Sequence, residues 1–125
     1  MPGIVAALPK IRRTQGERSA STRSRLLDAT IDSLAELGYA GTTTTVIAER
    51  AGVSRGAQLH HFPTKAELVT TAVEHLFQRR NQEFRTAMAK LPPAVDRAEA
   101  AVDLLWAIFS GPTFYAWLEL VVAGR

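Results

Sequence analysis

The chain has 125 residues, of which 46% are hydrophobic and 22% are charged, and its formal net charge is +3. This length suits one globular domain of ordinary size and excludes a large multi-domain enzyme. The sequence holds no cysteine, which excludes a disulfide scaffold, a thiolate metal site and a cysteine nucleophile. The hydrophobic fraction is too high for intrinsic disorder, at least after about the first twenty residues.

The positive charge is concentrated at the N-terminal end. Residues 1–25 hold six basic side chains and one acidic side chain, whereas residues 26–125 hold nine basic and eleven acidic ones. Proline and glycine interrupt residues 1–18 and no apolar period is sustained there, so we predict a flexible basic arm over 1–18. Such an arm either contacts a polyanion or keeps the chain soluble. The candidate phosphate contacts are Arg12, Arg13, Arg18 and Arg23.

The apolar spacing after the arm predicts helices and no strands, so the expected fold class is all-α. A first helix should begin near residues 19–21 and stop at Gly38, with Leu27, Ile31 and Leu34 on its apolar face. A long helix is predicted from Lys65 to Lys90, a span of 26 residues or about 39 Å. It should start with a capping box in which Thr64 and Glu67 bond reciprocally.

The apolar stretch 104–123 is long enough to cross a bilayer. However, Gly111-Pro112 would interrupt a span and Glu119 would be costly in lipid, so we interpret the stretch as parts of two buried helices. One helix is expected over 95–109 and the other from Thr113 onward. The apolar run Ile4–Leu8 is short and is followed by its positive charges, which does not fit a secretory signal. We therefore expect a cytoplasmic protein with no membrane partner.

Residues 43–62 carry the most informative pattern. Two short helices are separated by a corner at Gly52, which permits a sharp turn because it lacks a Cβ. The first is expected to start within the threonine run 42–45, whose hydroxyls can accept from first-turn amides, and Ser54 is expected to cap the second. This pattern is typical of a helix-turn-helix unit. In such a unit the second helix enters the major groove of DNA while the first rests on the backbone.

The second short helix is suited to a groove. Ser54 caps it where partial positive charge favours phosphate, and Arg55 can pair with phosphate or read guanine. Gly56 and Ala57 have almost no side chain, so backbone and groove can approach closely. Gln58, His60 and His61 can offer hydrogen bonds, while Leu59 and Phe62 are expected to face the core.

These segments resemble the TetR family of bacterial transcriptional regulators. The resemblance rests on Gly38-Tyr39, on Thr43, on the run Ile47-Ala48-Glu49-Arg50-Ala51-Gly52-Val53-Ser54, and on His60-His61-Phe62-Pro63-Thr64-Lys65-Ala66-Glu67-Leu68. It covers about residues 20–80 in the family's order and spacing. It implies a DNA-binding domain over 19–80, with the motif at 43–62, followed over 81–125 by part of a helical regulatory domain.

The resemblance also implies roles for single residues. Thr43 would cap the first of the two short helices and touch phosphate, and Thr45 would point toward DNA. Arg55, Gly56 and Ala57 would form the base-reading edge. His60 and His61 would lie near the DNA backbone, and Lys65 would contact phosphate. Family members often carry a tyrosine at the position of Leu59, and leucine lacks the hydroxyl that would reach phosphate.

Length is a second departure from the family. Its members are usually longer and dimerise through two late helices, which would lie beyond Arg125. Three explanations stay open: a fragment, a truncated gene product, or a short variant that dimerises through another surface. Loss of those helices would uncover apolar side chains between Trp106 and Val121, which favours association.

The aromatic residues of the later helices fit either an ordinary core or a ligand cavity. The candidate pocket residues are Phe84, Met88, Trp106 and Phe109. We expect no metal site, because the adjacent His60 and His61 point about 100° apart on a helix and chelate poorly. We also expect neither a cofactor nor an enzyme, since the sequence has no nucleophile elbow and no glycine-rich phosphate loop.

The sequence therefore predicts a DNA-binding transcriptional regulator that acts as a homodimer on double-stranded DNA. We expect a repressor that is released by a small-molecule ligand. The alternative is a helical interaction or heterodimerisation module derived from a truncated regulator, which would bind through 104–123 and show no salt-sensitive affinity for DNA.

Overall fold

The computed structural model describes Arg12 and residues 14–124, and in this part of the chain it contains helices and no strand. The all-α prediction is confirmed. The helices are α1 (Gln15–Gly41), α2 (Thr44–Ala51), α3 (Arg55–His61), α4 (Lys65–Ala89), α5 (Arg97–Phe109) and α6 (Pro112–Ala123).

Helix α1 begins at Gln15, which corrects the expected start near residues 19–21. The Thr14 hydroxyl accepts a hydrogen bond from the Glu17 amide at 3.1 Å, and the Glu17 carboxylate accepts one from the Thr14 amide at 2.9 Å. This reciprocal capping box satisfies two amides that have no partner within the helix. Residues 15–18, which the charge pattern places in the flexible arm, are therefore helical.

Gly38 interrupts α1 rather than ending it. Its φ of 70° and ψ of 178° are not helical, and one further helical turn follows as far as Gly41. At the end of this turn the Thr42 amide donates to the carbonyls of Gly38 and Tyr39 at 3.1 and 3.2 Å. The break redirects the chain toward Thr43, which starts α2.

Helix α4 starts and ends close to the prediction, although its capping box is incomplete. The Thr64 hydroxyl accepts from the Glu67 amide at 3.2 Å. Within residues 14–124 the reciprocal bond from the Thr64 amide to the Glu67 side chain is absent. Thr64 therefore acts as a simple N-cap.

One core holds the first four helices together. Its central side chains, contributed by α1, α2, α4 and the residue that follows α3, are almost fully buried: Leu26, Leu27, Ala29, Ile47, Ala51, Phe62, Leu68 and Ala72. An ion pair of 2.6 Å between Arg50 and Glu36 ties α2 to α1 at the surface, and it holds the pKa of Glu36 below its ordinary value. Because core positions on α2 and α3 face inward, the opposite faces of these short helices are exposed.

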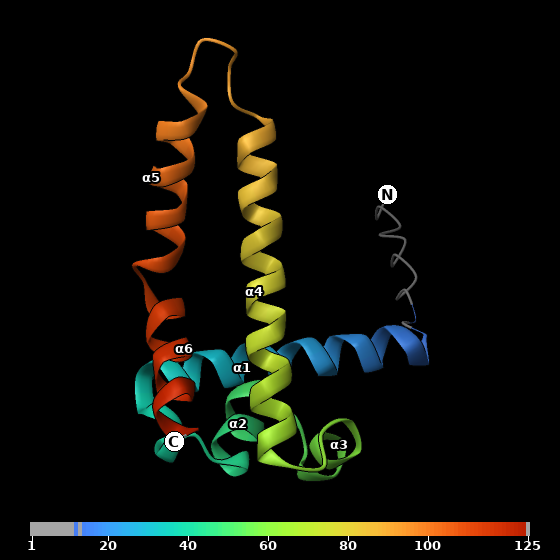
Figure 1. Cartoon of the computed structure of the whole chain (residues 1–125). Helices are drawn as coiled ribbons and strands as arrows, with labels where there is room; N and C mark the ends of the chain where they lie inside the picture. The colour runs from blue at the N-terminus through green and yellow to red at the C-terminus, as the bar shows by residue number, and fades with distance from the viewer. Residues whose placement is uncertain (1–11, 13, 125) are drawn as a thin grey trace, which may run out of the picture.

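The second half of the chain forms a hairpin that returns to α1 (Figure 1). Helix α4 runs away from the first three helices, α5 returns beside it, and α6 lies against the C-terminal part of α1. Leu34, Val69 and Ala116 form a second buried cluster where α6 packs on α1 and α4.

The predicted break between α5 and α6 is confirmed, because α5 ends at Phe109 and α6 begins at Pro112. In the described part of the chain no single helix is long and apolar enough to span a membrane; taken together, α5 and α6 pass that test by length and composition, with a bend of 61°. Our expectation that both helices are buried is wrong for much of their surface. The large apolar residues at least 39% exposed in this region are Val102, Leu105, Trp106, Phe109, Phe114, Tyr115, Trp117, Leu118, Val121 and Val122.

Candidate nucleic-acid interface

The corner between α2 and α3 is built on Gly52. Its φ of 63° and ψ of 38° are left-handed, a conformation that costs residues with a Cβ. The Val53 amide donates to the Ala48 carbonyl at 3.0 Å and the Gly52 amide to the Glu49 carbonyl at 3.2 Å, which is the Schellman pattern of a helix end. Val53 then packs against the core, so the corner holds α3 at a fixed angle to α2.

Hydroxyl caps start both short helices, as the sequence predicts. Thr43 Oγ1 accepts from the Val46 amide at 3.1 Å, and Ser54 Oγ accepts from the Ala57 amide at 3.2 Å. Both cap residues are exposed. The caps make each helix begin at a defined residue, which fixes the directions of the side chains that follow.

The first residues of α2 and α3 come together on one exposed face. Arg55 Nη1 donates to Thr45 Oγ1 at 2.9 Å, and both side chains are exposed. Gly56 lies beside Arg55, and a Cβ built on it would meet nothing within 4 Å. Together with the half-buried Ala57, these residues form a face on which few side-chain atoms project, with the cationic Arg55 at its edge.

Structure corrects the inward and outward faces of α3. Gln58, which we expected at the groove, is only 1% exposed, and its Nε2 donates to the Thr44 carbonyl at 2.9 Å. Leu59, which we expected in the core, is 49% exposed, whereas Phe62 is buried as predicted. Gln58 therefore anchors α3 to the start of α2 and is not available to a ligand.

The C-terminal end of α3 carries the two histidines. The rings of His60 and His61 lie edge to face with centroids 5.6 Å apart. Burial lowers the pKa of His61 below its ordinary value, and the charges of His60 and Arg23 lower it further. His61 is therefore largely neutral at pH 7 and can act as a hydrogen-bond donor and acceptor.

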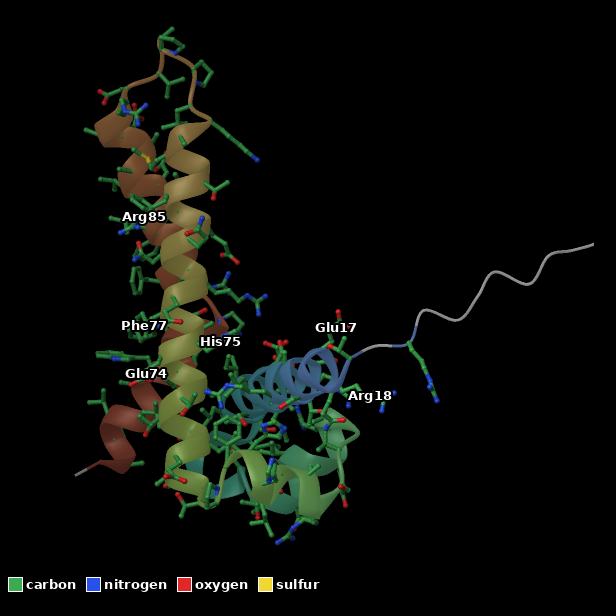
Figure 2. The ribbon with its side chains drawn as sticks, turned by 90° about the vertical axis from the view of Figure 1, so that its right-hand side faces the viewer. Glu17, Arg18, Glu74, His75, Phe77 and Arg85 are labelled. Carbon is green, nitrogen blue, oxygen red and sulfur yellow. The ribbon has the colours of Figure 1, made fainter. Side chains whose placement is uncertain are left out.

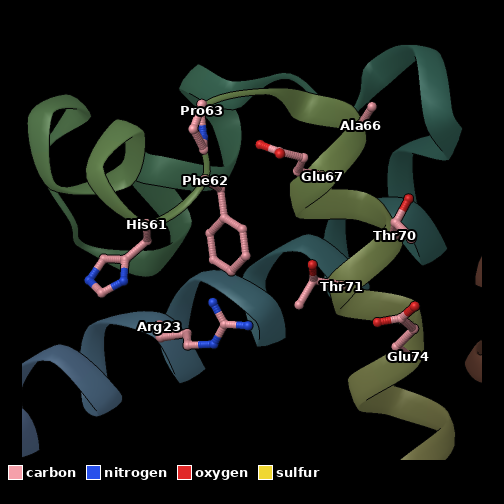
Figure 3. Close-up of a pocket in the computed structure, with 9 residues that line it drawn as sticks. All are labelled: Arg23, His61, Phe62, Pro63, Ala66, Glu67, Thr70, Thr71 and Glu74. Carbon is pink, nitrogen blue, oxygen red and sulfur yellow. The ribbon is translucent and has the colours of Figure 1, made fainter.

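Arg23 lies within α1 rather than in an arm, and its side chain contacts Phe62 (Figure 3). It projects from α1 toward Phe62, and its guanidinium carbon lies 4.8 Å from the centre of that ring. This cation–π contact forms one wall of a surface hollow of about 540 Å³, which Glu67 and Glu74 of α4 line on the other side. Arg23 is thus engaged with the residue that ends α3.

The other candidate phosphate contacts of the arm, Arg12, Arg13 and Arg18, fall on different parts of the chain. Glu17 and Arg18 lie at the N-terminal end of α1 (Figure 2), and Arg12 is exposed just before the helix. Arg13 lies outside the described residues. Arg18 therefore belongs to the first helix, and Arg12 precedes it by a few residues.

Lys65 at the start of α4 is turned toward α1. Its Nζ donates to the Tyr39 carbonyl at 2.8 Å and lies 3.9 Å from the centre of the Tyr39 ring. Sequence reasoning missed Tyr39 as the partner, because the two residues are 26 positions apart.

Three of the four predicted pocket residues line two neighbouring cavities between α4, α5 and α6. Trp106 and Phe109 line a cavity of about 440 Å³, and Phe84 and Phe109 line one of about 390 Å³. Met88 lines neither of them. Among the described residues, Arg80 is the one charged side chain that lines these cavities, and its Nε donates to Thr113 Oγ1 at 3.2 Å.

The described residues contain no group of three histidine, aspartate or glutamate side chains placed to hold a metal ion. His75 contacts Asp28 at 3.9 Å, and Arg79 pairs with the same carboxylate at 3.1 Å. These contacts tie α4 to α1 where the two helices cross.

Comparison with known proteins gives consistent matches. Residues 26–72 match the family described as "Bacterial regulatory proteins, tetR family". The chain is 41% identical over 112 residues to the HTH-type transcriptional regulator CymR of Pseudomonas putida, a match that covers 90% of the chain and 55% of CymR. It is 37% identical over 113 residues to an uncharacterized HTH-type transcriptional regulator of Mycobacterium tuberculosis, covering 90% and 58%. The chain thus spans little more than half the length of these curated relatives.

Proposed function

Because the chain belongs to the tetR family of bacterial regulatory proteins, we propose that it is a sequence-specific DNA-binding regulator of transcription that reads the major groove with α3. The observation that carries this proposal is the exposed face formed by Thr45, Arg55, Gly56 and Ala57. The Gln58 bond to α2 and the buried Phe62 hold α3 from behind while this face points outward.

The chemistry of the face suits base edges. An arginine guanidinium can donate two hydrogen bonds to guanine O6 and N7, and its pairing with Thr45 restricts where it points. The exposed caps Thr43 and Ser54 flank this face, and hydroxyls of this kind contact phosphates. In the proposed complex His60, His61 and Lys65 lie near the phosphate backbone.

The first prediction concerns Gly56. Replacing it with alanine is expected to leave the fold intact, or to stabilise it by up to about 1 kcal/mol, because alanine is the better helix former and the new Cβ meets open space. The same methyl group should weaken duplex binding at least about threefold, since it stands between the backbone of α3 and the groove. Thermal denaturation and fluorescence anisotropy with a labelled duplex measure the two effects. Unchanged affinity would refute the close approach.

A second prediction concerns the basic N-terminus. Deleting residues 1–13 keeps the Thr14 cap of α1 while removing Lys10, Arg12 and Arg13. If these cations displace counterions from DNA, the slope of log affinity against log salt should fall by about 0.9 for each phosphate that the deleted cations neutralise. The slope is measured by anisotropy over a salt series. A slope equal to that of the full chain would make the arm a passive tail.

We further propose that the regulator is a cytoplasmic homodimer and a repressor released by a small molecule. A two-fold dimer would place two copies of α3 in successive major grooves about 34–36 Å apart. The aromatic cavities between α4, α5 and α6 support the ligand site. A ligand bound there would tilt α4, whose N-terminal end packs against the DNA-binding core. A ligand that leaves duplex affinity unchanged at every concentration would remove this coupling.

A second candidate function is favoured by the exposed apolar residues of α5 and α6. Such a surface is typical of a protein interaction site, and a helical module that binds another protein through 104–123 would use it. This candidate predicts no salt-sensitive duplex affinity.

Selection from a pool of randomised duplexes separates the two candidates. The regulator should enrich one sequence, bind it more tightly than the starting pool, and lose affinity steeply as salt rises. Sedimentation of the same mixtures reports whether one or two copies bind. If no sequence is enriched while the protein still associates through α5 and α6, the interaction module is the better account.

A further inference from the structure

Tyr39 forms hydrogen bonds with two separate parts of the molecule. Its amide donates to Glu119 Oε2 of α6 at 3.1 Å, and its carbonyl accepts from Lys65 Nζ of α4 at 2.8 Å. Tyr39 follows directly on the break in α1, shortly before Thr43 caps α2. One backbone residue thus joins the C-terminal helix to a predicted phosphate contact.

The break at Gly38 explains why Tyr39 needs a partner from outside the helix. A new helical turn begins after the break, and the amides of a first turn have no acceptor within it. Glu119 supplies that acceptor in the manner of an N-cap. Glycine favours this approach, since a Cβ on Gly38 would lie 2.9 Å from Glu119 Oε2 and the φ of 70° disfavours residues other than glycine.

Packing of α6 determines where Glu119 lies. Ala116 is buried with Leu34 and Val69, and Leu120 packs against the same cluster beside Tyr39. Glu119 lies between these two α6 residues in sequence, so the docking of α6 on α1 carries its carboxylate to the break. Movement of α6 would therefore withdraw the acceptor from Tyr39.

Lys65 is held but keeps donors free. Its ammonium lies over the Tyr39 ring and gives one hydrogen bond to the Tyr39 carbonyl. An ammonium has three N–H groups, so Lys65 can bind a phosphate while it keeps its bond to the Tyr39 carbonyl. A lysine held in this way loses less side-chain entropy on binding than a free one.

We propose that Glu119 is a positioning residue for the DNA-binding surface and acts through Tyr39 on Lys65. The inference rests on the proposed function. The position of α6 can then affect the interface without a tilt of α4. The Glu119 carboxylate holds Tyr39, and Tyr39 holds Lys65.

Two substitutions of similar size distinguish the positioning role of Glu119 from the effect of its negative charge on DNA binding. Glu119→Met removes the acceptor, whereas Glu119→Gln keeps an acceptor oxygen, and both remove the same negative charge. Charge loss alone should tighten DNA binding in both variants. Positioning predicts that Glu119→Met weakens affinity for the enriched duplex about three- to tenfold while Glu119→Gln stays close to the wild type.

The Lys65→Met background tests the route. There, Glu119→Met should cause no further loss of affinity, because the lysine it positions is absent. Amide hydrogen exchange without DNA gives an independent reading, with faster exchange at Tyr39 in Glu119→Met and wild-type exchange in Glu119→Gln. Thermal denaturation of each variant checks that it is folded.

Four results overturn the inference: tighter binding by both variants, equal affinity of both variants and the wild type, equal weakening by both, or a full Glu119→Met effect in the Lys65→Met background. In each of these results the wild type binds the duplex, so the proposed function stands. A wild type that binds no duplex at low salt overturns the proposed function and this inference with it.

Discussion

Replacing Arg55 with alanine is expected to reduce affinity for the preferred duplex by about 1–3 kcal/mol, which is roughly five- to 150-fold. The loss should be confined to one base pair, because a guanidinium that reads guanine discriminates only at that position. Selection of the variant on randomised duplexes should therefore recover the same motif with one position relaxed. Anisotropy on single-base variants of the duplex measures the size of the loss.

Two control variants separate base reading from charge. Arg55→Lys keeps the charge but loses the planar fork, so it should resemble Arg55→Ala at that position. Arg85→Ala removes the same charge high on α4, away from α3 (Figure 2), and should change affinity little. Equal weakening by Arg55→Ala on all duplex sequences would make Arg55 a phosphate contact and contradict its role as a base reader.

Replacing Leu26 with alanine is expected to destabilise the protein by about 2–5 kcal/mol. Leu26 is fully buried in the core that joins the first four helices, and truncation leaves a cavity there. A domain of this size has a total stability of about 5–15 kcal/mol, so much of it would be lost. Urea denaturation followed by circular dichroism measures the change, and duplex binding should fall only as far as the protein unfolds.

Leu59→Ala is the matched control, since it removes the same atoms from a side chain that is half exposed. Its cost should stay below about 1 kcal/mol, because an exposed leucine has little burial to lose. Similar costs for the two variants would contradict an α3 that turns Leu59 outward.

Helix ends were largely predictable because local chemistry determines them. Thr43, Ser54 and Thr64 cap helices where their hydroxyls indicate, and the corner at Gly52 is left-handed as its glycine suggests. The start of α1 was also present in the sequence, as a threonine followed three residues later by Glu17, but the basic charges around it favoured an arm. The capping box of Thr14 and Glu17 starts the helix there despite the surrounding basic charges.

The faces of α3 were harder to predict, because a helix of seven residues is too short for a clear apolar period. Leucine is usually buried, yet the bond from Gln58 to the Thr44 carbonyl makes glutamine the inward residue. The spacing of Gln58 four residues before the buried Phe62 was the signal that could have placed it.

The contacts of Lys65 depend on tertiary structure. Its charge and its place at the start of α4 indicate phosphate, but the distance of Lys65 from Tyr39 along the chain hides this contact, and the distance of Tyr39 from Glu119 hides the next one. The pocket residues show the same limit, since Phe84, Trp106 and Phe109 gather only once α5 folds back beside α4, and Met88 lines neither cavity.

The central claim is that the exposed face of α3 binds DNA. Backbone amide chemical shifts, recorded by NMR while the enriched duplex is titrated into labelled protein, test it most directly. We expect the shifts to change most at residues 43–45, 54–57 and 60–61 and at Lys65. Changes confined to α5 and α6, with α3 unaffected at saturating duplex, would contradict the claim.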